Sequence, residues 1–230
     1  MQAEKMSMIS TFLTGAAHEL KNPLFVISGW AQMMKRKGDL NNEQLKCMDY
    51  IMDGTYRCIG IVENLLNLTR NNVVESKNLD LNAVVRSAVE KIRNTLEERR
   101  LELTLDLSSY AKMTGSVSEM EQVVSHLISN AADAVAGRAK GRIKVRTQET
   151  EAICLLEVRD NGAGMTPEVQ QKLFDPFFTT KDVGQGTGLG MTIVKRIIDN
   201  HRGKINVESR PGEGTSITIS FPRTGAGDGA

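Results

Sequence analysis

The sequence lacks several features that would place it quickly in a functional class. Its net charge is only +1 over 230 residues, so electrostatics gives no argument for a nucleic acid or an anionic membrane surface as partner. No apolar run approaches the ~20 residues needed to span a bilayer, and no signal peptide opens the chain. The three cysteines are widely spaced without a metal-ligand pattern, so we expect buried, reduced thiols. The segment is predicted to be soluble and cytoplasmic, although a membrane anchor could lie upstream in a longer parent protein.

Residues 1–70 predict a helical hairpin. Apolar side chains recur every three or four positions along two stretches, which is the spacing of a helix-packing seam. The first stretch carries Leu13, Ala17, Leu20, Leu24, Ile27, Ala31 and Met34, and the second carries Leu45, Met48, Met52, Thr55, Ile59, Val62 and Leu66. Between them lie Gly38 as a helix stop and Asn or Asp residues as helix caps. Because two helices alone bury little apolar area, a homodimer that forms a four-helix bundle is the simplest way to complete the core.

The rest of the chain predicts an α+β domain over residues 79–223, after a polar linker at 71–78. Strands are expected at 79–81, 102–107, 143–148, 153–159, 204–209 and 216–221, and helices at 82–97, 117–136, 167–173 and 189–201. Asn82 could cap the first of these helices. Strands and helices mix without regular βαβ alternation, which favours a two-layer α/β sandwich over a Rossmann sheet. The Gly-rich tail at 224–230 is predicted to be disordered.

The run Ala17-His18-Glu19-Leu20-Lys21-Asn22-Pro23-Leu24 is the most informative segment. On a helix, His18 and Asn22 are four residues apart and share a face, and Glu19 is placed to take a proton from the imidazole. With a reference pKa near ~6.5, much of a histidine is neutral and nucleophilic at pH 7. The run therefore reads as a nucleophile, a general base and a polar positioning residue. Taken alone, however, a His-Glu pair is more simply a surface histidine with a solvated neighbour.

Two glycine-rich loops indicate a nucleotide site. Asp160-Asn161-Gly162-Ala163-Gly164-Met165 follows an apolar strand, and a carboxylate there can accept a hydrogen bond from an exocyclic amine such as that of adenine. The second loop, residues 184–190, opens a helix, and glycine amides at a helix N-terminus suit phosphates. It is neither a P-loop nor a Rossmann fingerprint, since no Gly-Lys-Ser/Thr closes it and no βαβ unit frames it.

Two further features are compatible with nucleotide binding. Asn130 lies in a predicted helix, where its amide oxygen could bind Mg²⁺, although a lone helix asparagine is more often just solvated. Residues 174–181 hold three of the six phenylalanines. They form either a small core patch or the base of a hinged lid, from which Lys181 could reach a phosphate.

Six segments occur in a fixed order along nearly the whole chain, roughly residues 4–222. They are residues 18–24, the Asn130 helix, and residues 160–165, 174–181, 184–191 and 212–215. Together they resemble the H, N, G1, F, G2 and G3 boxes of bacterial two-component sensor histidine kinases, most closely the nitrogen-regulator and sporulation-kinase branch. The resemblance implies a dimeric helical hairpin that carries a Bergerat-type ATP-binding domain, with ATP and Mg²⁺ as ligands.

The resemblance also implies a role for each matching position. His18 would be the phosphoacceptor, Glu19 its base, and Asn22 a positioning residue for phosphatase chemistry on the receiver domain of a response regulator. Asn130 would hold Mg²⁺, and Asp160 would read adenine. The other nucleotide-binding positions would be Ala134, Gly162, Gly164, Lys181, Gly186, Thr187, Gly188, Leu189, Gly190 and Thr215.

The sequence departs from the family pattern at His126. The family usually has Asn four residues before the metal-binding Asn, whereas in the gyrase and MutL relatives of this ATP fold the matching position resembles a Glu that activates water. His126 is no carboxylate base, which favours transfer to a protein histidine over hydrolysis. Two alternatives stay open. One is a GHKL-type ATPase or conformational switch in which His18 is incidental, and the other is a core that works mainly as a phosphatase on its partner.

Overall fold

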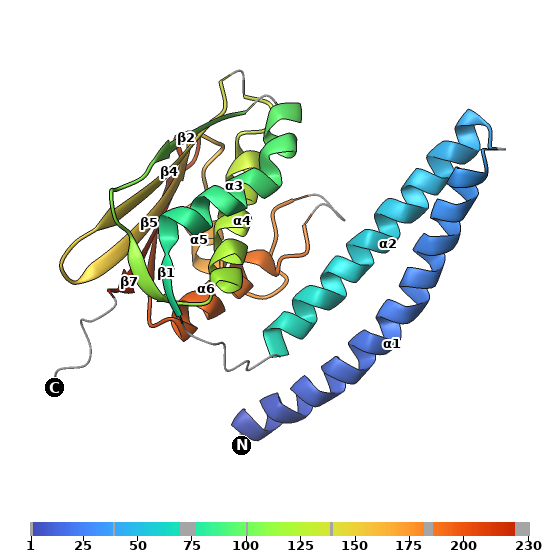
Figure 1. Cartoon of the computed structure of the whole chain (residues 1–230), viewed down its shortest axis with the longest axis horizontal. Coiled ribbons are helices and arrows are strands. Elements are labelled where there is room, and N and C mark those ends of the chain that lie inside the picture. Colours follow the sequence, from blue (N-terminus) through green and yellow to red (C-terminus); the bar gives the residue numbers. More distant parts are fainter. Residues whose placement is uncertain are drawn as a thin grey trace. The chain divides into compact units, whose positions relative to one another are not determined.

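The structure is a computed structural model that describes most of the chain as two compact units, divided between residues 72 and 73 (Figure 1). The described residues are 2–38, 40–69, 77–99, 101–138, 140–181 and 186–223, without the side chains of residues 2–19, 57, 61, 63–69, 94 and 95. Residues 71–76 of the predicted linker and the predicted tail at 224–230 lie outside them. Lys77 and Asn78, which we also assigned to the linker, instead belong to the first strand.

The first unit is a hairpin of two long helices, α1 (Gln2–Lys37) and α2 (Asn42–Thr69), which pack against each other (Figure 1). Helix α1 continues through Pro23 and ends in three basic residues, which complement the negative end of its dipole. A reciprocal cap starts α2. The Asn41 side chain accepts the Gln44 N–H at 2.9 Å, and the Gln44 side chain accepts the Asn41 N–H at 2.9 Å. The predicted asparagine cap is therefore present.

The contact between the two helices uses only part of the predicted seam. The described residues that are buried in the hairpin are Ser28, Ala31, Thr55, Ile59 and Val62. By contrast, Leu20, Ile27 and Met34, which we placed in the seam, are 53%, 47% and 45% exposed. A single partner helix covers only a narrow stripe of α1, so the remainder of its wide apolar face stays at the surface.

The second unit is built on a five-stranded sheet in the order β2 (Glu102–Asp106), β4 (Arg142–Glu149), β5 (Ile153–Asp160), β7 (Gly214–Pro222) and β6 (Lys204–Arg210). A separate antiparallel pair joins β1 (Lys77–Asp80) and β3 (Lys112–Gly115). Strand β3 was missed, because four residues carry too little alternation to be recognised. Within the sheet, β2 and β4 are parallel, and their connection runs through β3 and helix α4 (Val117–Ala134), whereas the other pairs are antiparallel.

Three helices cover one face of the sheet, namely α3 (Leu81–Glu98), α4 and α6 (Gly190–Asn200), while α5 (Pro167–Lys172) is a short helix that follows β5 (Figure 1). Alternate strand residues such as Val145, Leu156 and Ile219 point into the core beneath α4 and α6. The predicted two-layer α+β sandwich is confirmed.

The start of α3 differs from the prediction. We expected Asn82 to cap this helix, but the Asp80 carboxylate accepts the Asn82 N–H at 2.9 Å. The Asn82 side chain is buried and bonds elsewhere: it accepts the Thr147 hydroxyl at 2.6 Å and donates to the Ser108 carbonyl at 2.8 Å. The helix therefore starts one residue earlier, and Asn82 ties it to strand β4.

The cysteines follow the prediction only in part. Cys154 is buried in β5, and burial raises its thiol pKa to about 12, so this thiol is inert at neutral pH. Cys47 and Cys58 lie on exposed positions of α2, and the expectation of buried thiols is wrong for both. Among the described residues, no helix combines the length and the apolar character needed to cross a membrane.

Candidate active site

A buried carboxylate ends the central strand β5. Asp160 is only 9% exposed and lies opposite Thr215 in the β5–β7 register. Its Oδ1 accepts the Gly162 N–H at 2.7 Å, and the Thr215 hydroxyl lies 2.9 Å from that of Ser209. Burial raises the pKa of Asp160, although backbone hydrogen bonds from Gly162 and Thr215 and the charge of Arg138 oppose this shift. A carboxylate fixed in this way can accept a hydrogen bond from a ligand amine with little competition from water.

The loop after β5 packs too closely for side chains at its two glycines. A Cβ on Gly162 would lie 2.6 Å from the Ala134 carbonyl oxygen. Gly164 has φ +66°, and a Cβ there would lie 1.9 Å from the Arg210 carbonyl oxygen. The Ala163 N–H donates to the Ala134 carbonyl at 2.9 Å. The loop is therefore clamped between the end of α4 and the β6–β7 turn, which fixes the backbone beside Asp160.

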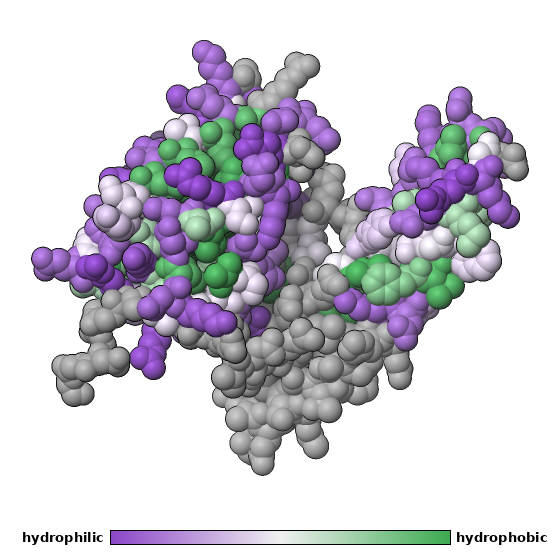
Figure 2. Space-filling view, viewed as in Figure 1, coloured by the Kyte–Doolittle hydropathy of each residue, from purple (hydrophilic) through white to green (hydrophobic). Residues whose placement is uncertain are grey.

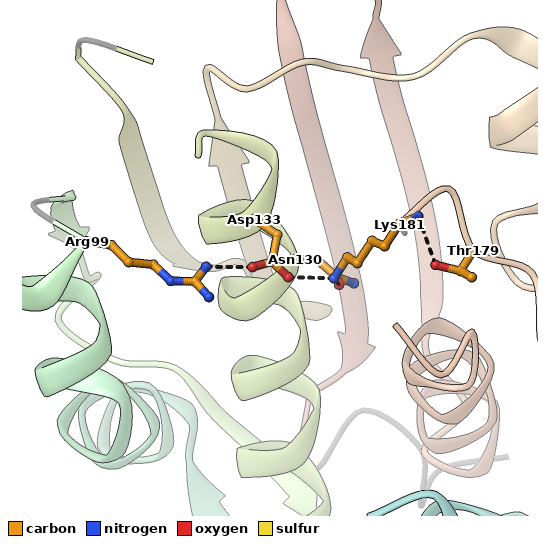
Figure 3. A network of polar contacts seen from close by, with 5 residues as sticks. All are labelled: Arg99, Asn130, Asp133, Thr179 and Lys181. Atoms are coloured by element: carbon orange, nitrogen blue, oxygen red, sulfur yellow. Dashed lines mark hydrogen bonds and ion pairs between the residues drawn. The ribbon is translucent and has the colours of Figure 1, made fainter. Parts of the chain in front are cut away.

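A polar network crosses helix α4 (Figure 3). Asn130 and Asp133 lie three residues apart on this helix, and the Lys181 ammonium donates to both, at 3.3 Å to Asn130 Oδ1 and 2.5 Å to Asp133 Oδ2. Arg99 Nη1 holds the other carboxylate oxygen of Asp133 at 2.6 Å. Burial alone would raise the pKa of Asp133, but the hydrogen bonds from Lys181 and Arg99 outweigh it and hold the pKa below its usual value. The carboxylate is therefore charged at neutral pH.

Neither Asp133 nor Arg99 was among the predicted site residues. A signal for Asp133 existed, because it follows Asn130 by three residues and so shares its helix face. For Arg99 the sequence offers no comparable signal. It lies just after α3 and reaches Asp133 only because α3 packs against α4.

The second glycine-rich loop leads into helix α6. Gly186, Thr187, Gly188, Leu189 and Gly190 are described, whereas Gly184 and Gln185 lie outside the described residues. Gly188 has φ +66°, and a Cβ there would lie 2.3 Å from the carbonyl carbon of Phe177. Leu189 provides no side-chain cap for α6. The first N–H groups of a helix have no partner within the helix, and such groups suit an anion.

His126 lies one turn before Asn130 on α4 and packs beside the start of α6. A Cβ on Gly190 would lie 3.4 Å from His126 Nδ1. Burial and the nearby charge of Lys181 lower the pKa of His126, so the imidazole is neutral at pH 7. This position thus places a neutral ring, and no carboxylate, next to the glycine-rich loop at residues 186–190.

The proposed acceptor residues lie in the other unit. His18, Glu19 and Asn22 all fall within helix α1. The side chains of His18 and Glu19 lie outside the described residues, and Asn22 is exposed. The predicted nucleotide residues from Asn130 to Thr215 come together in the second unit around α4, the end of β5 and the start of α6.

A helical hairpin with an acceptor-type histidine, followed by a sandwich with a buried Asp and glycine-rich loops, defines the class of histidine kinase cores. Comparison with known families agrees. Residues 8–72 match the His Kinase A (phospho-acceptor) domain, and residues 115–225 match the histidine kinase-, DNA gyrase B-, and HSP90-like ATPase family. The chain belongs to the two-component sensor histidine kinases, of which it carries the two catalytic-core domains.

Individual relatives support this assignment. The signal transduction histidine-protein kinase AtoS of Escherichia coli (strain K12) is 30% identical over 225 residues, which cover 96% of this chain and 36% of AtoS. Sporulation kinase B of Bacillus subtilis (strain 168) is 28% identical over 96% of this chain and 51% of its own length. The structure of histidine kinase ThkA in complex with response regulator protein TrrA matches with a TM-score of 0.69 and 25% identity, over 96% of this chain and 64% of ThkA. The chain thus spans about a third to a half of the two curated relatives.

Proposed function

We propose that this chain binds ATP in its second unit, transfers the γ-phosphoryl group to Nε2 of His18, and passes it to an aspartate of a response regulator. The observation that carries the proposal is the presence in one chain of a phospho-acceptor domain match and an ATPase domain match. ThkA, whose structure contains a response regulator, supports that class of partner. Asn22, exposed one helical turn after His18, suits a further phosphatase activity on the same partner.

In this proposal the second unit binds the nucleotide at the adenine base and at the phosphates. Asp160 accepts a hydrogen bond from the adenine amine, with Gly162, Gly164 and Thr215 shaping the pocket around it. The loop 186–190 and the N-terminus of α6 bind the phosphates through backbone N–H groups. Lys181 provides a positive charge beside this loop.

Asn130 suits a one-ligand Mg²⁺ site. Its half-buried amide oxygen is a hard donor, and it accepts a long hydrogen bond of 3.3 Å from Lys181. Within the described ranges, no group of three or more His, Cys, Asp or Glu side chains is arranged to hold a metal. A magnesium ion at Asn130 would therefore depend on water and phosphate oxygens for its other ligands, and it would supply neutralisation of phosphate charge.

The transfer itself needs few protein groups. Nε2 of a neutral His18 attacks the γ-phosphorus in line, the P–N bond forms, and the bond to the bridging oxygen breaks to release ADP. Glu19 accepts the Nδ1 proton as positive charge develops on the imidazole. His126 is neutral and is not a carboxylate, so it is a poor base for water, which favours transfer over hydrolysis.

Incubation of the chain with γ-labelled ATP and Mg²⁺ tests this function. The protein should acquire label that is lost in acid and retained in base, because a phosphoramidate P–N bond is acid-labile. Free phosphate should appear much more slowly than the label. Rapid phosphate release without protein labelling would instead support the ATPase or switch alternative, and acid-stable label would place the phosphate on a hydroxyl.

We also propose that two copies of the hairpin complete one core. Figure 2 shows apolar surface on the described part of the hairpin. Its exposed large apolar side chains are Leu20, Phe25, Val26, Ile27, Trp30, Met33 and Met34 on α1, and Tyr50, Ile51 and Tyr56 on α2. So many exposed apolar side chains on one hairpin are typical of a helix-bundle interface.

The whole chain is therefore expected to be a dimer in solution. Trp30 is 60% exposed in the single chain, so Trp30→Glu would bury a charge in the dimer and should shift the protein toward monomer at micromolar concentration. Light scattering measures this shift. Lys204→Glu on an exposed position of β6, outside the hairpin, is the control and should leave the dimer intact. An original chain that is monomeric throughout would contradict the four-helix bundle.

A further inference from the structure

The ammonium of Lys181 is shared between two groups on α4 rather than directed into solvent. It donates to the Asp133 carboxylate at 2.5 Å and to the Asn130 amide oxygen at 3.3 Å, which engages two of its three donors (Figure 3). The side chains of Lys181 and Asp133 are 33% and 30% exposed, so solvent screens this pair only in part. Any phosphate that binds Lys181 has to compete with the carboxylate.

The same lysine also lies beside the glycine-rich loop at residues 186–190. A Cβ on Gly186 would lie 3.1 Å from Lys181 Cδ, and the Lys181 N–H donates to Thr179 Oγ1 at 3.1 Å. The Lys181 backbone is thus held next to residues 186–190, while its side chain reaches across to α4. Rotation of the Lys181 side chain alone would move its ammonium from Asp133 to a phosphate bound at residues 186–190.

Asp133 is itself anchored so that it cannot follow the lysine. Arg99 holds its Oδ1 at 2.6 Å from outside the site, and Lys181 contacts its Oδ2. The two cations therefore approach opposite oxygens of one carboxylate. A metal ion at Asn130 would add a further positive charge beside Lys181, which makes the present position of the ammonium less favourable once the metal is bound.

We propose that Asp133 is a positioning residue that holds the Lys181 ammonium at Asn130 and releases it to the phosphates, so that this carboxylate sets the affinity of the site for nucleotide. The proposal rests on the proposed function, because it requires that the site binds ATP. Asp133 has no contact with Asp160 or with the reacting atoms in this proposal. Its effect passes entirely through Lys181.

The test measures MgATP binding to the full chain by calorimetry. Asp133→Asn keeps the size of the side chain and removes the competing charge, so affinity should rise by about two- to fivefold, the amount expected for a partly exposed ion pair. The KM for ATP in autophosphorylation should fall by the same factor, while the saturating rate stays within about twofold. Asp133→Glu, which retains a carboxylate, should restore the original affinity.

The decisive comparison repeats Asp133→Asn in a Lys181→Met background. There the substitution should change affinity less than about twofold, because no ammonium remains to be released. A full gain in that background would show that the carboxylate repels phosphates directly, and it would overturn the proposal. Equal or weaker binding by Asp133→Asn would overturn it as well.

A control on the same helix separates this effect from a general loss of charge. Glu121 holds Lys91 at 2.5 Å, away from the glycine-rich loops, so Glu121→Gln should leave MgATP affinity unchanged.

Thermal unfolding shows whether each variant folds, and Asp133→Ala replaces the asparagine variant if that variant does not fold. If the original chain fails to bind MgATP, the proposed function falls along with this inference. If it binds but Asp133→Asn brings no gain, only the inference falls.

Discussion

Replacing His18 with glutamine should abolish the acid-labile label while leaving MgATP affinity within a few fold of the original chain. Glutamine has no ring nitrogen that can attack phosphorus, so transfer has no acceptor at this position. Affinity should survive because the nucleotide residues all lie in the second compact unit, whereas His18 lies in α1 of the first. Labelling and calorimetry on the same preparation measure the two effects separately.

Two companion variants sharpen this result. His126→Asn introduces the residue that sensor histidine kinases usually have here. This variant should therefore acquire the acid-labile label as well as the original chain or better. Glu19→Gln should retain nucleotide binding but slow transfer by ~10²–10⁴-fold if Glu19 is a general base. Full labelling of the His18→Gln chain would identify a different acceptor and refute the central claim.

Replacing Asp160 with asparagine should weaken ATP binding by ~1–3 kcal/mol, which corresponds to roughly 5- to 150-fold in the dissociation constant. The carboxylate accepts the Gly162 N–H at 2.7 Å in a nearly closed environment. An asparagine places an amide donor on one side of this group, so either the backbone N–H or the ligand amine loses its acceptor. Calorimetry measures the loss, with Asp106→Asn at an exposed strand position as the control.

The pH dependence of ATP binding should follow the same group. Burial raises the pKa of Asp160, so protonation begins at a higher pH than for an ordinary aspartate. Because only the charged form is a full acceptor, affinity should fall as the pH drops through this raised pKa, and Asp160→Asn should remove that dependence. An unchanged dissociation constant in the variant would mean that adenine is recognised elsewhere.

The chemistry of the candidate site was readable from short segments of sequence. His18 beside Glu19, Asp160 before two glycines, and the loop ahead of α6 each derive their meaning from neighbours within a few residues. Helix periodicity likewise predicted both helices of the hairpin and the helices of the sandwich. These features depend on local backbone geometry, which a single stretch of chain specifies.

Contacts between distant segments were settled only in the folded chain. The parallel pairing of β2 with β4 depends on how α4 packs on the sheet, and the four-residue strand β3 gains its identity only by pairing with β1. Arg99, Asp133 and Lys181 come from three elements far apart in sequence and meet because α3 and the segment before α6 lie against opposite sides of α4. Local periodicity predicts which face of a helix is buried, but not which charged side chain a neighbouring element brings to it, because that depends on the packing of the whole domain.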